Sequence, residues 1–234
     1  MVKVYKPFSI SIISTGDEIR ELGKPIVDGG VYDINTYALA SEAKAIGIVV
    51  NNKYVLKDDE ELLRNTIIEE SKISDIVVTS GGSSKGKKDV TAKVIGEIAS
   101  SDILTHGIAL RPGKPTITAF DENSNTILVG LPGHPVAALL VFKLVVEELY
   151  EKKLGIVKEK FEIQATISTN IANSPGRMSA QLVELTREEN SYIATPILGK
   201  SGLMTTLTKS HGYVMMDRNS EGLKQGETVF VTIL

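Results

Sequence analysis

The first 150 or so residues alternate short apolar runs with longer stretches in which apolar positions recur every three or four residues. The apolar runs predict strands at 8–14, 75–80, 108–111, 116–120 and 126–130. The periodic stretches predict helices at 35–46, 58–73 (opened by an Asp cap), 89–100 and 135–152. Strands and helices in alternation indicate an α/β fold, a doubly wound and mostly parallel sheet with helices on both faces. The polar turn at 121–125 adds a hairpin at one edge.

Beyond residue 155 the pattern changes to strict alternation of polar and apolar residues, interrupted by Gly, Pro and Asn clusters. Strands are predicted at 161–169, 179–186, 192–195, 213–216 and 228–233. We therefore expect two domains, an α/β domain at 1–154 and a small all-β domain at 155–234.

Charge and composition exclude several classes of protein. With 26 basic and 29 acidic residues the net charge is -3, which argues against a surface made to bind nucleic acid or an anionic membrane. The absence of cysteine removes disulfides and thiolate metal sites, and it fits a cytoplasmic protein. The apolar run 136–150 is interrupted by charged residues and is shorter than the roughly 20 residues of a membrane span.

Candidate chemistry lies in the loops that follow strands, because ligands of open α/β sheets bind beyond the carboxyl ends of the strands. The first such loop contains Ser14, Thr15, Gly16 and Asp17. A solvated turn explains it as well as a ligand site does. Asp33 and Asn35 precede a predicted helix, where they either cap the helix or face the ligand.

A second loop is rich in glycine, serine and lysine and connects a strand to a helix. It contains Ser80, Gly81, Gly82, Ser83 and Ser84 and ends at Asp89. Backbone N–H groups, hydroxyls and a helix N-terminus together suit a phosphate or another oxyanion. Asp89 is an N-cap, a ligand-binding residue or both.

Two proline-containing loops complete the set. Arg111, Pro112, Gly113 and Lys114 form a compact cationic segment that is either an anion clamp or a rigid turn. Gly133 and His134 precede Pro135, which is suited to the first turn of a helix. From the residues alone, the sequence indicates a small polyanionic ligand at one edge of an α/β sheet, and it does not specify a reaction.

These loops occur in the order and spacing of one family. The motifs are 14–18 (STGDE), 32–35 (YDIN), 80–82 with Gly86 and Asp89, 112–115 (PGKP) and 131–135 (LPGHP). The chain resembles the molybdopterin molybdenumtransferases, the MoeA-type enzymes that include the gephyrin E domain. Residues 8–150 look like the molybdopterin-binding domain of that family, and 156–234 look like its C-terminal β domain.

The resemblance implies insertion of molybdate, or tungstate, into adenylylated molybdopterin with release of AMP, in a magnesium-dependent reaction of a homodimer. It implies catalytic roles for Asp33, Asp89 and Lys114, with Asp33 and Asp89 orienting the pterin or a metal-bound water. The other residues of the five loops would bind the pterin substrate and its phosphates.

The chain departs from the family at His134, where Asn is usual, at Ser83, where Val is common, and at Lys87, which is often acidic. Lys87 would repel magnesium. Full-length members also carry two upstream domains, so we expect an excised fragment, a naturally short chain or one half of a split enzyme with a separate N-terminal-domain protein. Two alternatives stay open: a molybdopterin adenylyltransferase on the same fold, and a non-catalytic dimeric scaffold module.

Overall fold

The computed structural model describes residues 6–81, 90–100, 102–155, 161–199 and 204–234, and it divides the chain into two compact units. The first unit comprises Met1–Ile108 and Pro115–Gly155, and the second comprises Ala109–Lys114 and Ile156–Leu234. Segment 109–114 thus belongs with the β-rich unit, whereas the sequence pattern placed it in the α/β domain.

The first unit contains one six-stranded sheet in the order β4-β1-β5-β9-β8-β6. Its strands are β1 (Ser9–Thr15), β4 (Val49–Leu56), β5 (Ile76–Gly81), β6 (Thr105–His106), β8 (Ile117–Asp121) and β9 (Thr126–Leu131). Strands β4, β1, β5 and β9 are parallel, while β8 and β6 are added antiparallel at one edge. The expected mostly parallel α/β sheet with an edge hairpin is confirmed.

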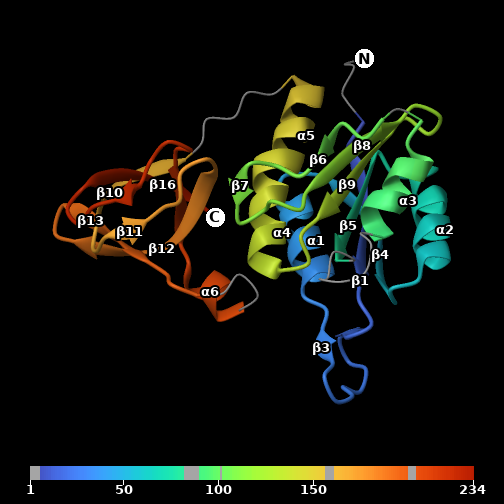
Figure 1. The fold of residues 1–234 in the computed structure, drawn as a ribbon, viewed down its shortest axis with the longest axis horizontal. Coiled ribbons are helices and arrows are strands. Elements are labelled where there is room, and N and C mark those ends of the chain that lie inside the picture. The colour runs from blue at the N-terminus through green and yellow to red at the C-terminus, as the bar shows by residue number, and fades with distance from the viewer. Residues whose placement is uncertain (1–5, 82–89, 101, 156–160, 200–203) are drawn as a thin grey trace. The chain divides into compact units, whose positions relative to one another are not determined.

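Helices cover both faces of this sheet. They are α1 (Asn35–Ala45), α2 (Glu60–Ser71), α3 (Val90–Ile98), α4 (Pro135–Val141) and α5 (Glu147–Leu154). Figure 1 shows α2 and α3 on one face and α1, α4 and α5 on the other. The Asp59 side chain caps α2 by accepting a hydrogen bond from the Leu62 N–H, so the helix begins two residues later than the sequence predicted.

The predicted helix at 135–152 is not a single α-helix. A π-helical segment, Phe142–Val146, separates α4 from α5. The chain then leaves α5 at Gly155, whose φ of +65° is in the left-handed region that favours glycine at a helix C-terminus.

The sequence pattern missed strand β4. Its side chains alternate between exposed and half-buried, and it carries Asn51, Asn52 and Lys53, residues that are uncommon in strands. As the edge strand of the sheet it needs only one partner, β1, and polar residues there discourage pairing with another chain.

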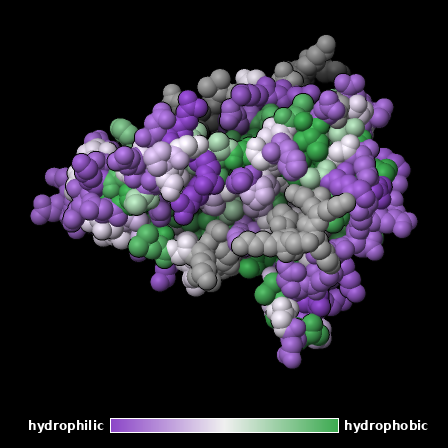
Figure 2. Space-filling view, in the orientation of Figure 1, coloured by the Kyte–Doolittle hydropathy of each residue, from purple (hydrophilic) through white to green (hydrophobic). Residues whose placement is uncertain are grey.

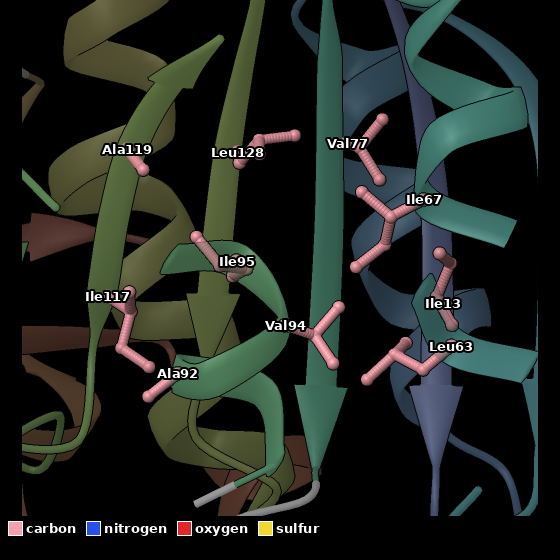
Figure 3. Packing of buried hydrophobic residues seen from close by; sticks show 10 residues of the cluster. All are labelled: Ile13, Leu63, Ile67, Val77, Ala92, Val94, Ile95, Ile117, Ala119 and Leu128. Atoms are coloured by element: carbon pink, nitrogen blue, oxygen red, sulfur yellow. The ribbon is translucent and has the colours of Figure 1, made fainter. Parts of the chain in front are cut away.

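Beneath α2 and α3 lies a core of aliphatic side chains from the sheet and from both helices (Figure 3). Ile13 from β1 and Val77 from β5 face Leu63 and Ile67 of α2. These four side chains are at most 2% exposed. Their close packing fixes the positions of β1 and β5, the strands from which the first two polar loops start.

An arm built on β2 (Ile19–Arg20) and β3 (Val31–Tyr32) extends from the sheet between β1 and α1 (Figure 1). Hydrophobic side chains are interspersed with hydrophilic ones on its surface (Figure 2). The exposed large hydrophobic residues of the arm are Leu22, Ile26, Val27, Val31 and Tyr32.

The second unit is a small β-barrel. Its strands are β7 (Leu110–Arg111), β10 (Glu162–Ile167), β12 (Met178–Glu188), β13 (Ser191–Pro196), β14 (Gly212–Met216) and β16 (Thr228–Ile233). The order β13-β10-β16-β14-β12 closes through a β12–β13 pairing, and β7 adds to β12. Short strands β11 (Ile171–Ala172) and β15 (Gly222–Leu223) form a separate pair. The predicted all-β character is confirmed.

The sequence pattern did not predict α6 (Met204–Lys209), a one-and-a-half-turn helix. Its sequence contains three threonines, and β-branched residues lower helix propensity. None of the helices in the described part of the chain is long and apolar enough to span a membrane.

Candidate functional site

Three parallel strands bring their carboxyl ends to one edge of the first unit's sheet. Ser14 is paired in register with Ser80, Thr15 with Gly81, and Ser80 with Leu131. The loops that follow β1, β5 and β9 therefore begin side by side, as the sequence analysis expected for a parallel sheet.

Asp33 is fixed at this edge by hydroxyl and amide donors. Its Oδ1 accepts hydrogen bonds from the Ser14 hydroxyl at 2.8 Å and from the Thr36 N–H at 3.3 Å, and its Oδ2 accepts one from the Thr36 hydroxyl. The residue is 4% exposed. The bond from the Thr36 amide satisfies an N–H of the first turn of α1, as the capping interpretation of Asp33 expects.

Asn35 connects three segments of the site. Its Nδ2 donates to Ser80 Oγ at 2.7 Å and to the Gly133 carbonyl at 2.8 Å. Ser80 Oγ in turn donates to the Pro132 carbonyl at 3.1 Å. The start of α1, the end of β5 and the turn between β9 and α4 are thus joined by side-chain hydrogen bonds.

Gly81 and Gly133 allow these loops to approach each other closely. Gly81 has a φ of +114°, and a Cβ there would lie 2.1 Å from the Thr15 carbonyl oxygen. A Cβ on Gly133 would lie 3.4 Å from the Gly81 Cα. His134 is exposed and directly precedes α4, which opens with Pro135 as predicted.

The first loop turns away from the sheet after Thr15. Gly16 donates its N–H to the Leu56 carbonyl at 3.1 Å, and a side chain there would clash with Ile19. Asp17 is exposed and its carboxylate accepts the Asp58 N–H at 3.3 Å. This bond connects the loop after β1 to the segment between β4 and α2.

Two other groups of candidate residues are not part of the described carboxyl edge of the first unit. Gly82, Ser83, Ser84 and Asp89 lie outside the described residues. The segment Arg111–Lys114 belongs to the second unit, where Arg111 pairs with Ser179 of β12. Arg111 and Lys114 are exposed, and Pro112 follows a cis peptide bond.

Sequence reasoning missed two hydroxyl residues of the site. Thr36 donates to Asp33, and Thr91 of α3 donates to the Gly81 carbonyl at 3.3 Å. Both are 2% exposed. A hydroxyl three residues after an aspartate at a helix start was a detectable signal for Thr36, but nothing local indicates the partner of Thr91.

Among the described residues, two buried polar atoms of this edge have no hydrogen-bond partner. They are Oγ1 of Thr15 and Oδ1 of Asn35. Leaving a buried polar atom unpaired costs about 1–3 kcal/mol, and such atoms are rare in folded proteins.

An α/β sheet with polar loops at the carboxyl ends of its parallel strands is the architecture in which ligand-binding domains of this class place their sites, and known families agree with that class. Residues 11–152 match a probable molybdopterin-binding domain, and residues 164–234 match the MoeA C-terminal region, domain IV. The chain belongs to the MoeA-type molybdopterin molybdenumtransferase family, of which it carries the C-terminal half. The resemblance inferred from the sequence is confirmed.

Individual relatives agree with this assignment. A molybdopterin molybdenumtransferase of Haemophilus influenzae is 30% identical over 98% of this chain and 57% of its own length. A putative molybdopterin biosynthesis protein of Methanocaldococcus jannaschii is 31% identical over the whole chain and 56% of its own length. The crystal structure of a molybdopterin biosynthesis MoeA protein from Pyrococcus horikosii superposes with a TM-score of 0.83 at 32% identity, covering 98% of this chain and 55% of that one. The chain thus spans little more than half the length of these relatives.

Proposed function

We propose that this chain takes part in inserting molybdate, or tungstate, into adenylylated molybdopterin with release of AMP. The observation that carries the proposal is that the Ser14–Asp33 and Asn35–Ser80 hydrogen bonds lie at the carboxyl edge of a domain that matches a probable molybdopterin-binding domain. The relatives named molybdenumtransferases are nearly twice as long. The reaction is therefore assigned to this chain together with the segments that its relatives carry in addition.

In this proposal Asp33 orients the substrate. A carboxylate held by three donors cannot rotate freely, and its direction is set before the ligand arrives. The phosphates are assigned to the N-terminus of α4 and, as the resemblance implies, to the glycine-rich loop that follows β5, since helix N-termini and glycine-rich loops suit oxyanions. Asp89, Gly82, Ser83 and Ser84 keep the roles that the resemblance gives them.

Arg111 and Lys114 are proposed as an anion clamp on the second unit. Gly113 between them has a φ of +136°, so the short turn depends on glycine. Both side chains are exposed and free to reach an anion such as molybdate or phosphate.

The described residues do not form a complete magnesium site on their own. They contain no cluster of three or more potential His, Asp or Glu ligands, and both oxygens of Asp33 already accept hydrogen bonds. Mg²⁺ is usually bound by one or two carboxylates together with substrate phosphates. We therefore assign no step to magnesium.

The proposal is tested by mixing the purified chain with adenylylated molybdopterin and molybdate, with and without a separate protein carrying the remaining segments of a relative. We expect AMP release that depends on molybdate and on the chain. No AMP release even with the added segments would refute the proposal. Light scattering of the same sample tests the proposed homodimer.

A matched pair of variants locates the site. Asp33→Asn removes a buried carboxylate at the carboxyl edge and should abolish most AMP release. Asp121→Asn makes the same change in the β8–β9 turn, which lies at the amino end of β9 and therefore away from the carboxyl ends of the parallel strands. Asp121 is 6% exposed, and its side chain accepts a hydrogen bond from the Ser124 hydroxyl at 2.6 Å. Equal loss in both variants would argue for a general folding defect rather than a site.

A further inference from the structure

The orientation of the Asn35 side-chain amide is determined by its neighbours. The Gly133 carbonyl can only accept a hydrogen bond, so the atom 2.8 Å from it must be the amide nitrogen. Ser80 donates its own proton to the Pro132 carbonyl, so Ser80 Oγ accepts the second amide proton. Both protons of Asn35 are committed to the protein.

Asn35 can therefore offer a ligand only a hydrogen-bond acceptor, its Oδ1. Its Oδ1 is buried and has no partner among the described residues, in a side chain that is 6% exposed. A hydrogen bond formed there is protected from competition by bulk water, and it recovers the cost of the unpaired acceptor.

An acceptor at this position distinguishes the two ends of the substrate. The pyrophosphate diester of adenylylated molybdopterin is fully ionised at neutral pH, so its oxygens are acceptors without an O–H donor and cannot satisfy Oδ1. The pyrimidinone ring of a pterin carries ring and amino N–H donors that can. A site that pairs a buried polar group with one ligand group rejects ligands lacking that group, because the buried atom is then left unpaired.

We infer that Asn35 is a specificity-determining residue whose Oδ1 accepts a hydrogen bond from an N–H group of the pterin ring. The ring end of the substrate, rather than its phosphate end, then lies against the start of α1. This inference rests on the proposed function, since it takes the ligand to be a pterin with phosphate attached.

Two variants separate an acceptor role of Oδ1 from a purely structural role of Nδ2. Asn35→Ala removes the acceptor and both donors, whereas Asn35→Asp keeps an oxygen acceptor and removes the donors. The probes are free pterin, followed by its fluorescence, and inorganic pyrophosphate, followed by calorimetry. We expect Asn35→Ala to weaken pterin binding at least about tenfold and pyrophosphate binding less than twofold, with Asn35→Asp retaining more pterin affinity than Asn35→Ala.

Asn51 provides the matched control. Its Nδ2 also donates to a serine hydroxyl and a backbone carbonyl, Ser74 Oγ at 2.9 Å and Ile73 O at 2.8 Å, before β5 instead of after it. Asn51→Ala and Asn51→Asp should leave both affinities unchanged. A urea titration of each variant shows whether it is folded.

The wild-type protein gives a test that does not depend on any variant. Dimethyllumazine is a pteridine whose ring nitrogens are methylated, so it has no N–H donor, and we expect it to bind at least about tenfold more weakly than pterin. Equal affinity for the two compounds, or equal loss of pterin and pyrophosphate in both Asn35 variants, would overturn the inference while leaving the proposed function intact. Failure of the wild type to bind pterin at all would also overturn the inference, whereas the proposed function is decided separately by the AMP-release assay with the added segments.

Discussion

The Ser14 hydroxyl donates a 2.8 Å hydrogen bond to Oδ1 of Asp33, joining the end of β1 to the residue that caps α1. Both side chains are at most 4% exposed, so the bond is shielded from water. Ser14→Ala should lower the free energy of unfolding by about 1–3 kcal/mol, because a buried charged acceptor loses one of its donors. It should also weaken pterin binding, since Asp33 loses one of the three donors that set its direction.

Ser9→Ala is the control for this prediction. Ser9 lies on the same strand, and its hydroxyl donates to Asp75 at 2.8 Å at the opposite edge of the sheet. Urea denaturation should show comparable destabilisation for the two variants, whereas fluorescence titration with pterin should show a loss for Ser14→Ala only. Identical ligand affinities would mean that the Ser14–Asp33 bond is purely structural.

Gly81→Ala should be strongly destabilising. The φ of +114° alone costs a residue with a side chain on the order of 1–3 kcal/mol, and the new Cβ would lie 2.1 Å from the Thr15 carbonyl oxygen. Gly23→Ala tests the backbone term separately, since Gly23 has a φ of +87° and no described atom within 4 Å of an added Cβ. We expect the urea midpoint to fall further for Gly81→Ala than for Gly23→Ala. Equal shifts would show that the β1 and β5 ends are not packed as tightly as described.

The sequence predicted those parts of the site that depend on local patterns. A glycine after a buried strand and an aspartate before a helix are signals within a few residues, so Gly81 and Asp33 could be named as candidates from the sequence. The Asn35 bonds, in contrast, span 45 residues to Ser80 and 98 to Gly133, and only the folded sheet brings these partners together.

The distance between partners along the chain also explains where the fold predicted from the sequence was wrong. Strand β4 carries polar residues because one side of it has no strand neighbour, which no local pattern reveals. Segment 109–114 looked like one more strand and loop of the α/β sheet, but β7 hydrogen-bonds to β12, a strand more than 60 residues further along the chain. Strand pairing over such distances is a property of the tertiary structure.

Glu147 makes the stability of the first unit depend on pH. Burial raises its pKa to about 7, with the neighbouring Glu42 adding to the rise and Lys143, whose Nζ lies 3.5 Å from Oε1, opposing it. The native state therefore holds a proton that the unfolded chain releases near pH 4.5. Stability contributed by protonated Glu147 is present at and below pH 4.5 and is lost as the pH rises to about 7.

Glu147→Gln should remove this dependence. The free energy of unfolding of the variant minus that of the wild type should be about 1–3 kcal/mol larger at pH 8 than at pH 4.5. Urea denaturation at each pH measures this difference. Glu148→Gln is the control, because Glu148 is exposed and pairs with Lys152 at 2.8 Å. The prediction fails if the difference between wild type and Glu147→Gln is the same at both pH values.

A buried carboxylate on the opposite face of the sheet should behave differently from Glu147. Glu70 is 4% exposed, and although burial acts to raise its pKa, hydrogen bonds from Ser11, Tyr54 and Asn52 outweigh burial and lower it. The Tyr54 hydroxyl donates to Glu70 Oε1 at 2.7 Å, and this bond is the main reason that the Tyr54 pKa is raised.

Tyr54→Phe should therefore cost about 1–3 kcal/mol of unfolding free energy above pH 4.5, because an ionised buried acceptor loses a donor while the ring packing is kept. The cost should shrink as the pH falls and Glu70 becomes protonated. Tyr37→Phe is the control, since Tyr37 is exposed and a phenylalanine retains the ring that lies 3.9 Å from Lys53 Nζ. Guanidinium titrations that gave the same small loss for both variants would show that the Glu70 carboxylate does not depend on Tyr54.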